Sequence, residues 1–117
     1  MDDLSIKVRD SANVAILDLK GRITIGEPAS LLRDKIRETL DSGYRKILLN
    51  FGDVSYMDSA GLGQLVGSFA TAAHRSAEIK LVALNKRVQE LMLITRVDTI
   101  FETFATEHAA IRSFNER

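Results

Sequence analysis

The spacing of apolar and polar positions changes several times along the chain. Apolar residues alternate with polar ones over residues 4–8, and a more continuous apolar run covers residues 14–19. Alternation indicates a half-exposed strand, whereas a continuous run indicates a buried one. Because only a short polar stretch separates the two runs, we predict an antiparallel hairpin. A loop over residues 21–26, with a glycine at each end, is expected to follow it.

Helical spacing begins after Pro28, which suits the first turn of a helix because its missing N–H is not needed there. Apolar residues then recur three or four positions apart to about residue 41 and again over residues 62–73, 88–95 and 107–114. Apolar runs at residues 47–51 and 79–84 predict buried strands, and Phe104 marks a short last strand or an extended edge. Thr106 is the expected cap of the last helix.

Strands that alternate with helices are expected to be parallel and joined by right-handed crossovers. The order of the predicted elements therefore indicates an α/β fold. We predict a mixed sheet of four to five strands with an N-terminal β-hairpin and about four helices. At 117 residues the chain has the length of one compact domain, so we expect a single domain over residues 1–117.

The helix predicted over residues 62–73 begins beside two candidate N-cap residues, Asp58 and Ser59. No charged residue lies between residues 60 and 73, and the segment contains three glycines, each costing a helix roughly 1 kcal/mol relative to alanine. Two explanations remain open: a partner docks on the uncharged face, or other elements of the chain bury it. The predicted outer face consists of Ala60, Gln64, Gly67, Ser68 and Thr71.

Composition excludes several classes of function. Sixteen basic and sixteen acidic residues give a net charge of zero, which argues against a broad surface for nucleic acid or an anionic membrane. The chain has no cysteine, which removes thiol and iron–sulfur chemistry and suits a reducing compartment. Its acidic beginning does not resemble a signal peptide, and no apolar run is long enough to span a bilayer. We therefore expect a cytoplasmic protein.

Enzyme chemistry finds little support. Ser59 precedes Gly61, but Met57 stands where the hydrolase elbow needs its first glycine, and His74 would lie about four helical turns away. Two histidines without cysteine or a cluster of carboxylates make no convincing metal site. The glycines match neither the dinucleotide fingerprint nor a phosphate-binding loop. We expect no catalytic activity, no metal and no cofactor.

Ser59 can instead serve as a hydroxyl that another protein phosphorylates. A phosphate adds about −1.5 to −2 charge at neutral pH, and the N-terminus of a helix tolerates an anion. The effect of the charge would then fall on a docked partner, giving a binding switch without a change of fold. The alternative is that Ser59 is only an N-cap, contributing about 1 kcal/mol.

The six residues from Asp58 to Gly63, Asp-Ser-Ala-Gly-Leu-Gly, resemble the phosphorylation motif of the STAS domain of bacterial anti-sigma factor antagonists. Residues 14–21 resemble that family's second strand and following glycine. The chain departs from the family pattern at Thr24 and Asn50, where aspartate is common. The resemblance implies that the unphosphorylated protein binds an anti-sigma factor serine kinase and releases a sigma factor. The kinase then phosphorylates Ser59, and a metal-dependent phosphatase of the PP2C type reverses the step.

The residues and the resemblance together predict a non-enzymatic switch with Ser59 as the phosphorylated residue and Asp58 as its support. The alternative is a STAS module that binds constitutively in a signalling scaffold or a transporter complex. The predicted motif and partner-binding residues are Thr24, Tyr56, Met57, Asp58, Ser59, Ala60, Gly61, Gly63, Gln64, Gly67 and Ser68.

Overall fold

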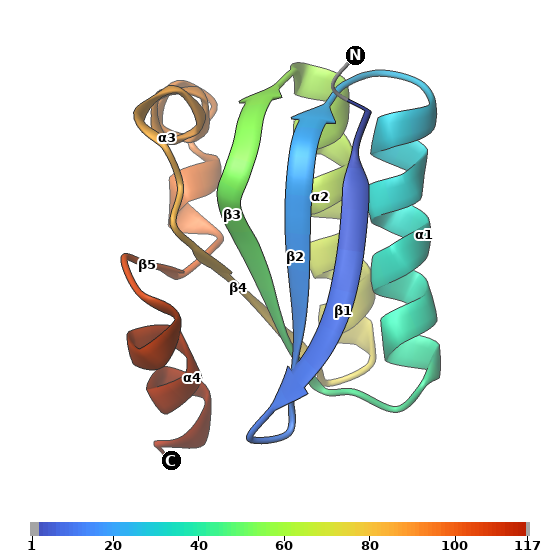
Figure 1. The fold of residues 1–117 in the computed structure, drawn as a ribbon, viewed down its shortest axis with the longest axis vertical. Coiled ribbons are helices and arrows are strands. Elements are labelled where there is room, and N and C mark those ends of the chain that lie inside the picture. The colour runs from blue at the N-terminus through green and yellow to red at the C-terminus, as the bar shows by residue number, and fades with distance from the viewer. Residues whose placement is uncertain (1–2, 117) are drawn as a thin grey trace.

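The computed structural model describes residues 3–116 and contains one mixed sheet with the strand order β1-β2-β3-β4-β5 (Figure 1). Four α-helices and one 3-10 turn accompany the sheet within these residues, which confirms the predicted α/β class. The elements in chain order are β1 (Ser5–Ser11), β2 (Val14–Ile23), α1 (Glu27–Asp41), β3 (Lys46–Met57), α2 (Ser59–His74), β4 (Glu78–Val82), α3 (Lys86–Ile94), η1 (Val97–Thr99), β5 (Thr103–Phe104) and α4 (Glu107–Asn115).

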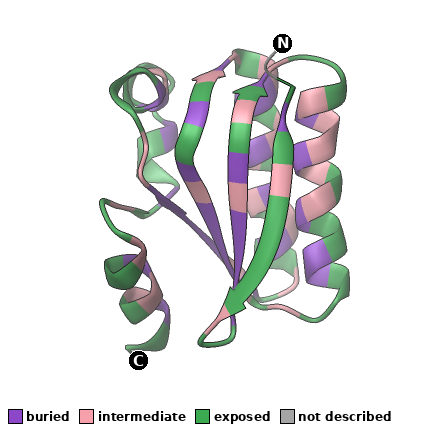
Figure 2. Cartoon of the chain, in the orientation of Figure 1, coloured by how far each residue is buried: buried purple, intermediate pink, exposed green. Residues whose placement is uncertain are grey.

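The predicted N-terminal hairpin is confirmed. β1 pairs antiparallel with β2, in a register that joins Ser11 to Val14 across the turn. The turn residues Ala12 and Asn13 both have positive φ, 54° and 67°, which is the backbone combination of the tight hairpin turn that follows strand twist. β1 forms an edge of the sheet and is largely exposed (Figure 2).

The pairs β2–β3, β3–β4 and β4–β5 are parallel, as the alternation of strands and helices predicts. Two strands are longer than expected, however: β2 continues to Ile23 and β3 to Met57. The loop expected over residues 21–26 therefore shrinks to residues 24–26, and residues 52–57, expected as a loop, are strand. Two irregularities in the β2–β3 register shift the alternation of side chains, which hides these strand ends from a period-two pattern.

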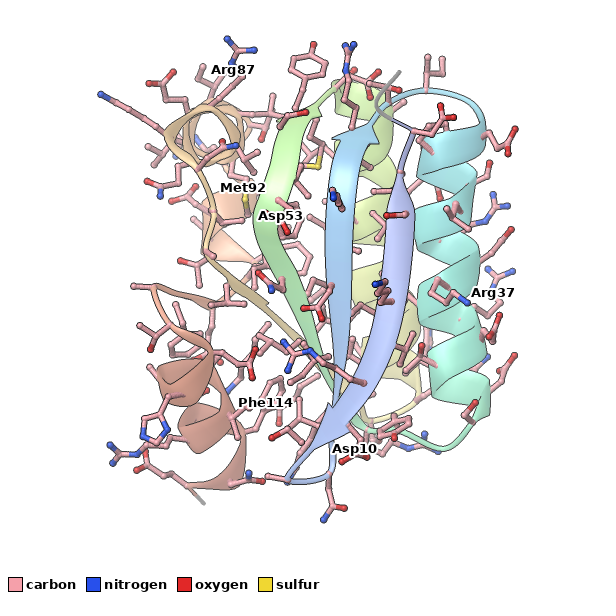
Figure 3. The ribbon with its side chains drawn as sticks, in the orientation of Figure 1. Asp10, Arg37, Asp53, Arg87, Met92 and Phe114 are labelled. Carbon is pink, nitrogen blue, oxygen red and sulfur yellow. The ribbon has the colours of Figure 1, made fainter. Side chains whose placement is uncertain are left out.

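The two faces of the sheet carry separate apolar clusters because neighbouring residues of a strand point to opposite faces. Leu17 and Leu49 belong to the larger cluster, which also takes in buried residues of α1, α2 and α3. Ile16 and Leu48 belong to the smaller one, beneath α4. Phe114 points from α4 toward the sheet and completes this cluster (Figure 3).

Polar contacts also fasten α4. Arg9 of β1 binds Asp18 of β2 at 2.6 Å and reaches Glu107 at the start of α4. The hydrogen bond from Arg9 lowers the pKa of Asp18, and the same contacts raise the pKa of Arg9. The ammonium of Lys80, which is 3% exposed, lies 2.6 Å from the hydroxyl of Ser113. The C-terminal helix is thus tied to β1 and β4 by the polar contacts of charged side chains as well as by packing.

The caps and ends of the shorter elements agree with the sequence predictions, except at the end of β4. Thr106 caps α4 as predicted, accepting from the N–H of Ala109 at 3.2 Å. β4 ends at Val82, not at residue 84, because Ala83 has a φ of 63° and turns the chain. Asn85, which the sequence did not single out, caps α3 and also donates to the carbonyl of Val54 in β3 at 2.8 Å.

The first turn of α2 lies against the end of β2. A Cβ atom added at Gly61 would come within 2.3 Å of the carbonyl oxygen of Ile23, whereas one added at Gly63 meets nothing within 4 Å. Gly61 is therefore required by the fold, since any side chain would push the helix away from the sheet. Gly63 has no such role in the packing of the chain.

Substitution of these two glycines should have opposite effects. Gly61→Ala is expected to lower the free energy of unfolding by about 1–3 kcal/mol through overpacking. Gly63→Ala is expected to raise it by up to about 1 kcal/mol because alanine favours the helix. Urea unfolding followed by circular dichroism measures both. If both substitutions changed the free energy of unfolding equally, this result would contradict the close approach of Gly61 to Ile23.

Candidate functional site

Asp58 occupies the junction between β3 and α2 and caps the helix. One carboxylate oxygen accepts from the N–H of Gly61 at 2.9 Å, and the other accepts from the N–H of Ile25 at 2.9 Å. The backbone N–H of Asp58 donates to the carbonyl of Ile23 at 3.2 Å. One residue thus joins the end of β2, the loop over residues 24–26 and the start of α2.

Burial alone would raise the pKa of Asp58, but the backbone N–H donors around its carboxylate outweigh burial and lower it. The donors include Gly61 and Ile25. A carboxylate held by N–H groups at a helix N-terminus is stabilised in its charged form. Asp58 is therefore a fixed anion beside Ser59, bonded to the backbone rather than to the neighbouring hydroxyl.

Ser59 is the first residue of α2 and is exposed. Its hydroxyl makes no hydrogen bond with any other residue of the described range 3–116. Of the two N-cap candidates, Asp58 holds the cap position, so the alternative that Ser59 serves as the cap is wrong. Ser59 presents a free hydroxyl that another protein can reach.

The uncharged face of α2 differs from the predicted one. Its most exposed line is made of small residues and one histidine, and we call it the α2 stripe: Ser59, Gly63, Gly67, Ala70 and His74. Ser68, expected on the outer face, is 4% exposed, while Gln64 and Thr71 are half-buried. These three residues face α1 across a shallow hollow of about 150 Å³. The explanation by burial within the chain holds for the side that α1 covers, whereas docking of a partner on the open stripe stays a prediction.

Three predicted partner-binding residues are buried and lack the surface expected of them. Met57 is 4% exposed and belongs to the larger core. Gly61 is buried against Ile23, and Ser68 is buried at the hollow between α1 and α2. Thr24 and Ala60 are half-buried, so each retains some surface. The buried residues support the motif from within.

Tyr56 is half-buried near the end of β3, between two arginines from other elements. The guanidinium of Arg22 lies 5.1 Å from the centre of its ring, and that of Arg87 lies 5.9 Å from it. Arg87 projects from α3 at the end of the molecule where β2 and β3 finish (Figure 3). Both distances suit a cation over an aromatic face. The site therefore has a basic border, which the sequence analysis did not identify.

Ile25 and two arginines of α1 are further residues that the sequence analysis missed. Ile25 is 77% exposed and is held in place by the bond from its N–H to Asp58. Arg33 and Arg37 line the hollow between α1 and α2. An apolar residue inside the polar loop after β2 is a signal that could have identified Ile25. The arginines carry no such signal, because they form part of an ordinary charged helix face.

The described residues offer little for metal or acid–base chemistry at this site. No group of three or more histidine, aspartate or glutamate side chains within residues 3–116 could hold a metal ion. His74 sits at the far end of α2 from Ser59, as expected. Among the same residues, no helix has the length and apolar composition needed to cross a membrane.

The sheet order and the helices that accompany the sheet define an α/β protein. Residues 5–110 match the STAS domain family, and the chain belongs to that family. Two curated relatives carry the name anti-sigma-B factor antagonist. The one from Listeria monocytogenes is 32% identical over 85% of each chain. The one from Bacillus subtilis is 28% identical over 94% of this chain and 99% of its own.

Solved structures support the same fold. The anti-sigma factor antagonist SpoIIAA in its unphosphorylated form superposes with a TM-score of 0.73 at 19% identity, covering 95% of this chain and 98% of its own. Its phosphorylated form gives a TM-score of 0.72 at 20% identity, covering 94% and 99%. The two forms match this fold almost equally well.

Loss of the Asp58 side chain should destabilise the protein. Asp58→Ala is expected to lower the free energy of unfolding by about 1 kcal/mol at pH 7, because the helix loses its cap. The pKa of Asp58 is lower in the folded than in the unfolded chain. The contribution of Asp58 to the free energy of unfolding is therefore fully present above the unfolded pKa of about 4, and it is lost as the pH falls through the folded pKa. The difference in the free energy of unfolding between wild type and Asp58→Ala should therefore become smaller below about pH 4.

Urea unfolding of both proteins from pH 7 to pH 3 measures this dependence, with Ser59→Ala as the matched control. The control should change stability by less than about 0.5 kcal/mol at every pH, because the hydroxyl is unbonded. A difference between wild type and Asp58→Ala that stays constant over this range would contradict the assigned role of Asp58.

Proposed function

We propose that this protein is an anti-sigma factor antagonist controlled by phosphorylation of Ser59. Unphosphorylated, it binds an anti-sigma factor serine kinase, which then releases a sigma factor. The kinase transfers phosphate to Ser59 and the complex separates, and a PP2C-type phosphatase restores the binding form. The observation that carries the proposal is the exposed, unbonded hydroxyl of Ser59 beside the cap of α2. The names of the relatives support the class of function.

The local electrostatics explain how phosphorylation can act on binding and leave the fold intact. A phosphate on Ser59 would sit at the N-terminus of α2, where the helix dipole favours an anion. It would also stand next to the fixed carboxylate of Asp58, which already uses the N–H of Gly61. The added charge would therefore remain exposed to a partner. An uncharged contact that desolvates a double negative charge is strongly unfavourable.

The α2 stripe explains why a partner can approach closely. Gly63 and Gly67 have open space where a Cβ would lie, so the packing of the chain does not require glycine there. Each costs the helix up to about 1 kcal/mol relative to alanine. Backbone without side chains allows a partner surface to come near the helix axis. Ile25 adds an apolar contact at one end of the stripe.

Phosphorylation is tested by intact-mass and fragment analysis after incubation with ATP and a candidate anti-sigma factor serine kinase. We expect a single added phosphate on Ser59 and none on Ser59→Ala. Ser59→Asp should weaken kinase binding at least tenfold, or about 1.4 kcal/mol, with a nearly unchanged thermal transition. No modification by several such kinases, with equal binding of wild type and Ser59→Asp, would favour a constitutive STAS module.

A larger side chain on the α2 stripe provides a second test. Gly63→Leu should weaken kinase binding at least tenfold, since the new side chain holds the partner off the helix backbone. Ala73→Leu, exposed about 15 Å further along the same helix, is the matched control and should bind as wild type does. Isothermal titration measures both affinities. Unchanged binding of Gly63→Leu would show that the stripe is not the contact surface.

A further inference from the structure

A second concave site lies away from Ser59, between α3, η1 and β5. Its volume is about 510 Å³, within the range of roughly 300–1,000 Å³ found for small-molecule pockets. It opens beside Ala83 and Ala105, just past the carboxyl ends of β4 and β5. The pocket therefore lies at the carboxyl edge of the parallel strands.

The walls of this pocket are mainly apolar. Leu84, Met92 and Leu93 line it from the side of α3, and Phe104 lines it from β5. Leu93 is 61% exposed, although a leucine on a helix normally seeks the core. An apolar molecule in the pocket would cover part of this side chain.

The polar side chains of the pocket are mainly acceptors. The amide nitrogen of Gln89 donates one of its two N–H groups to the carbonyl of Leu84 at 2.9 Å, and the amide oxygen is available as an acceptor. The side chains of Asp98 and Thr103 make no hydrogen bond or ion pair with other residues in the described part of the chain. Within residues 3–116 no lysine or arginine lines the pocket, so no basic side chain of that range would neutralise an anion there.

We propose that this pocket binds a small molecule with an apolar body and a primary ammonium group. The apolar part fills the space between Met92, Leu93 and Phe104, and the ammonium pairs with the carboxylate of Asp98. A charge-assisted hydrogen bond of this kind is about twice as strong as a neutral one, which favours an amine over an alcohol of the same shape. The site is separate from Ser59 and does not depend on the proposed switch.

The test titrates the isotope-labelled full chain with 2-phenylethylamine and follows amide shifts by NMR. We expect saturable shifts at Leu84, Leu93, Asp98 and Phe104. The neutral 2-phenylethanol should bind more weakly at the same residues, and 3-phenylpropanoate should not bind. Asp98→Asn should raise the Kd for the amine about tenfold and leave the Kd for the alcohol unchanged. Asp98 is exposed and unbonded, so this nearly isosteric change does not threaten folding.

Two further variants make the result specific. Glu90→Gln removes an exposed carboxylate of α3 outside the pocket and should leave amine binding as in wild type. Ala105→Trp should fill the pocket and abolish binding of both the amine and the alcohol. The proposal is overturned by the absence of saturable shifts, by shifts confined to other residues, by equal binding of 3-phenylpropanoate, or by amine binding that is insensitive to Asp98→Asn or to Ala105→Trp.

Discussion

The carboxylate of Asp58 is the interaction on which the arrangement of the site depends. It accepts one hydrogen bond of 2.9 Å from the N–H of Gly61 in the first turn of α2. It accepts a second bond of 2.9 Å from the N–H of Ile25 in the loop over residues 24–26. Because it is satisfied by backbone groups, it places Ser59 outward without consuming its hydroxyl. The close approach of Gly61 to Ile23 adds a steric condition to this electrostatic one. Together these two contacts set the position of Ser59 relative to the sheet.

The helices cover the two faces of the sheet unequally. Three helices share the larger core on one face of the sheet, and α4 covers only part of the other face. The C-terminal helix depends on the contacts of Arg9 and Lys80 as well as on Phe114. The α2 stripe has no such cover. Its glycines weaken the helix slightly and leave its backbone accessible.

Two surfaces of different character thus lie on one small chain. Around Ser59 the surface combines small uncharged residues with an apolar Ile25 and a border of arginines. Such a surface suits a protein partner, whose contact centre is depleted in charge. The pocket beside α3 is concave, apolar and acceptor-rich, which suits a small cationic molecule instead. Asn85 contacts Val54 and Arg87 contacts Tyr56, so β3 touches the start of α3 as well as the site around Ser59.

The order and type of the main elements, the hairpin, the cap at Thr106 and the motif around Ser59 can all be predicted from the sequence. These features depend on local period and on capping groups a few residues apart. The ends of β2 and β3 depend on how the two strands pair in the folded protein, because the shifts of register between them conceal the alternation of side chains. The pairing of distant segments settles such ends. Tertiary packing also decides which side of α2 stays open, since a helix without charges has no polar face to mark it and the docking of α1 makes the choice. The contact between Ile25 and Asp58 spans 33 residues, and no local pattern can reveal such a contact.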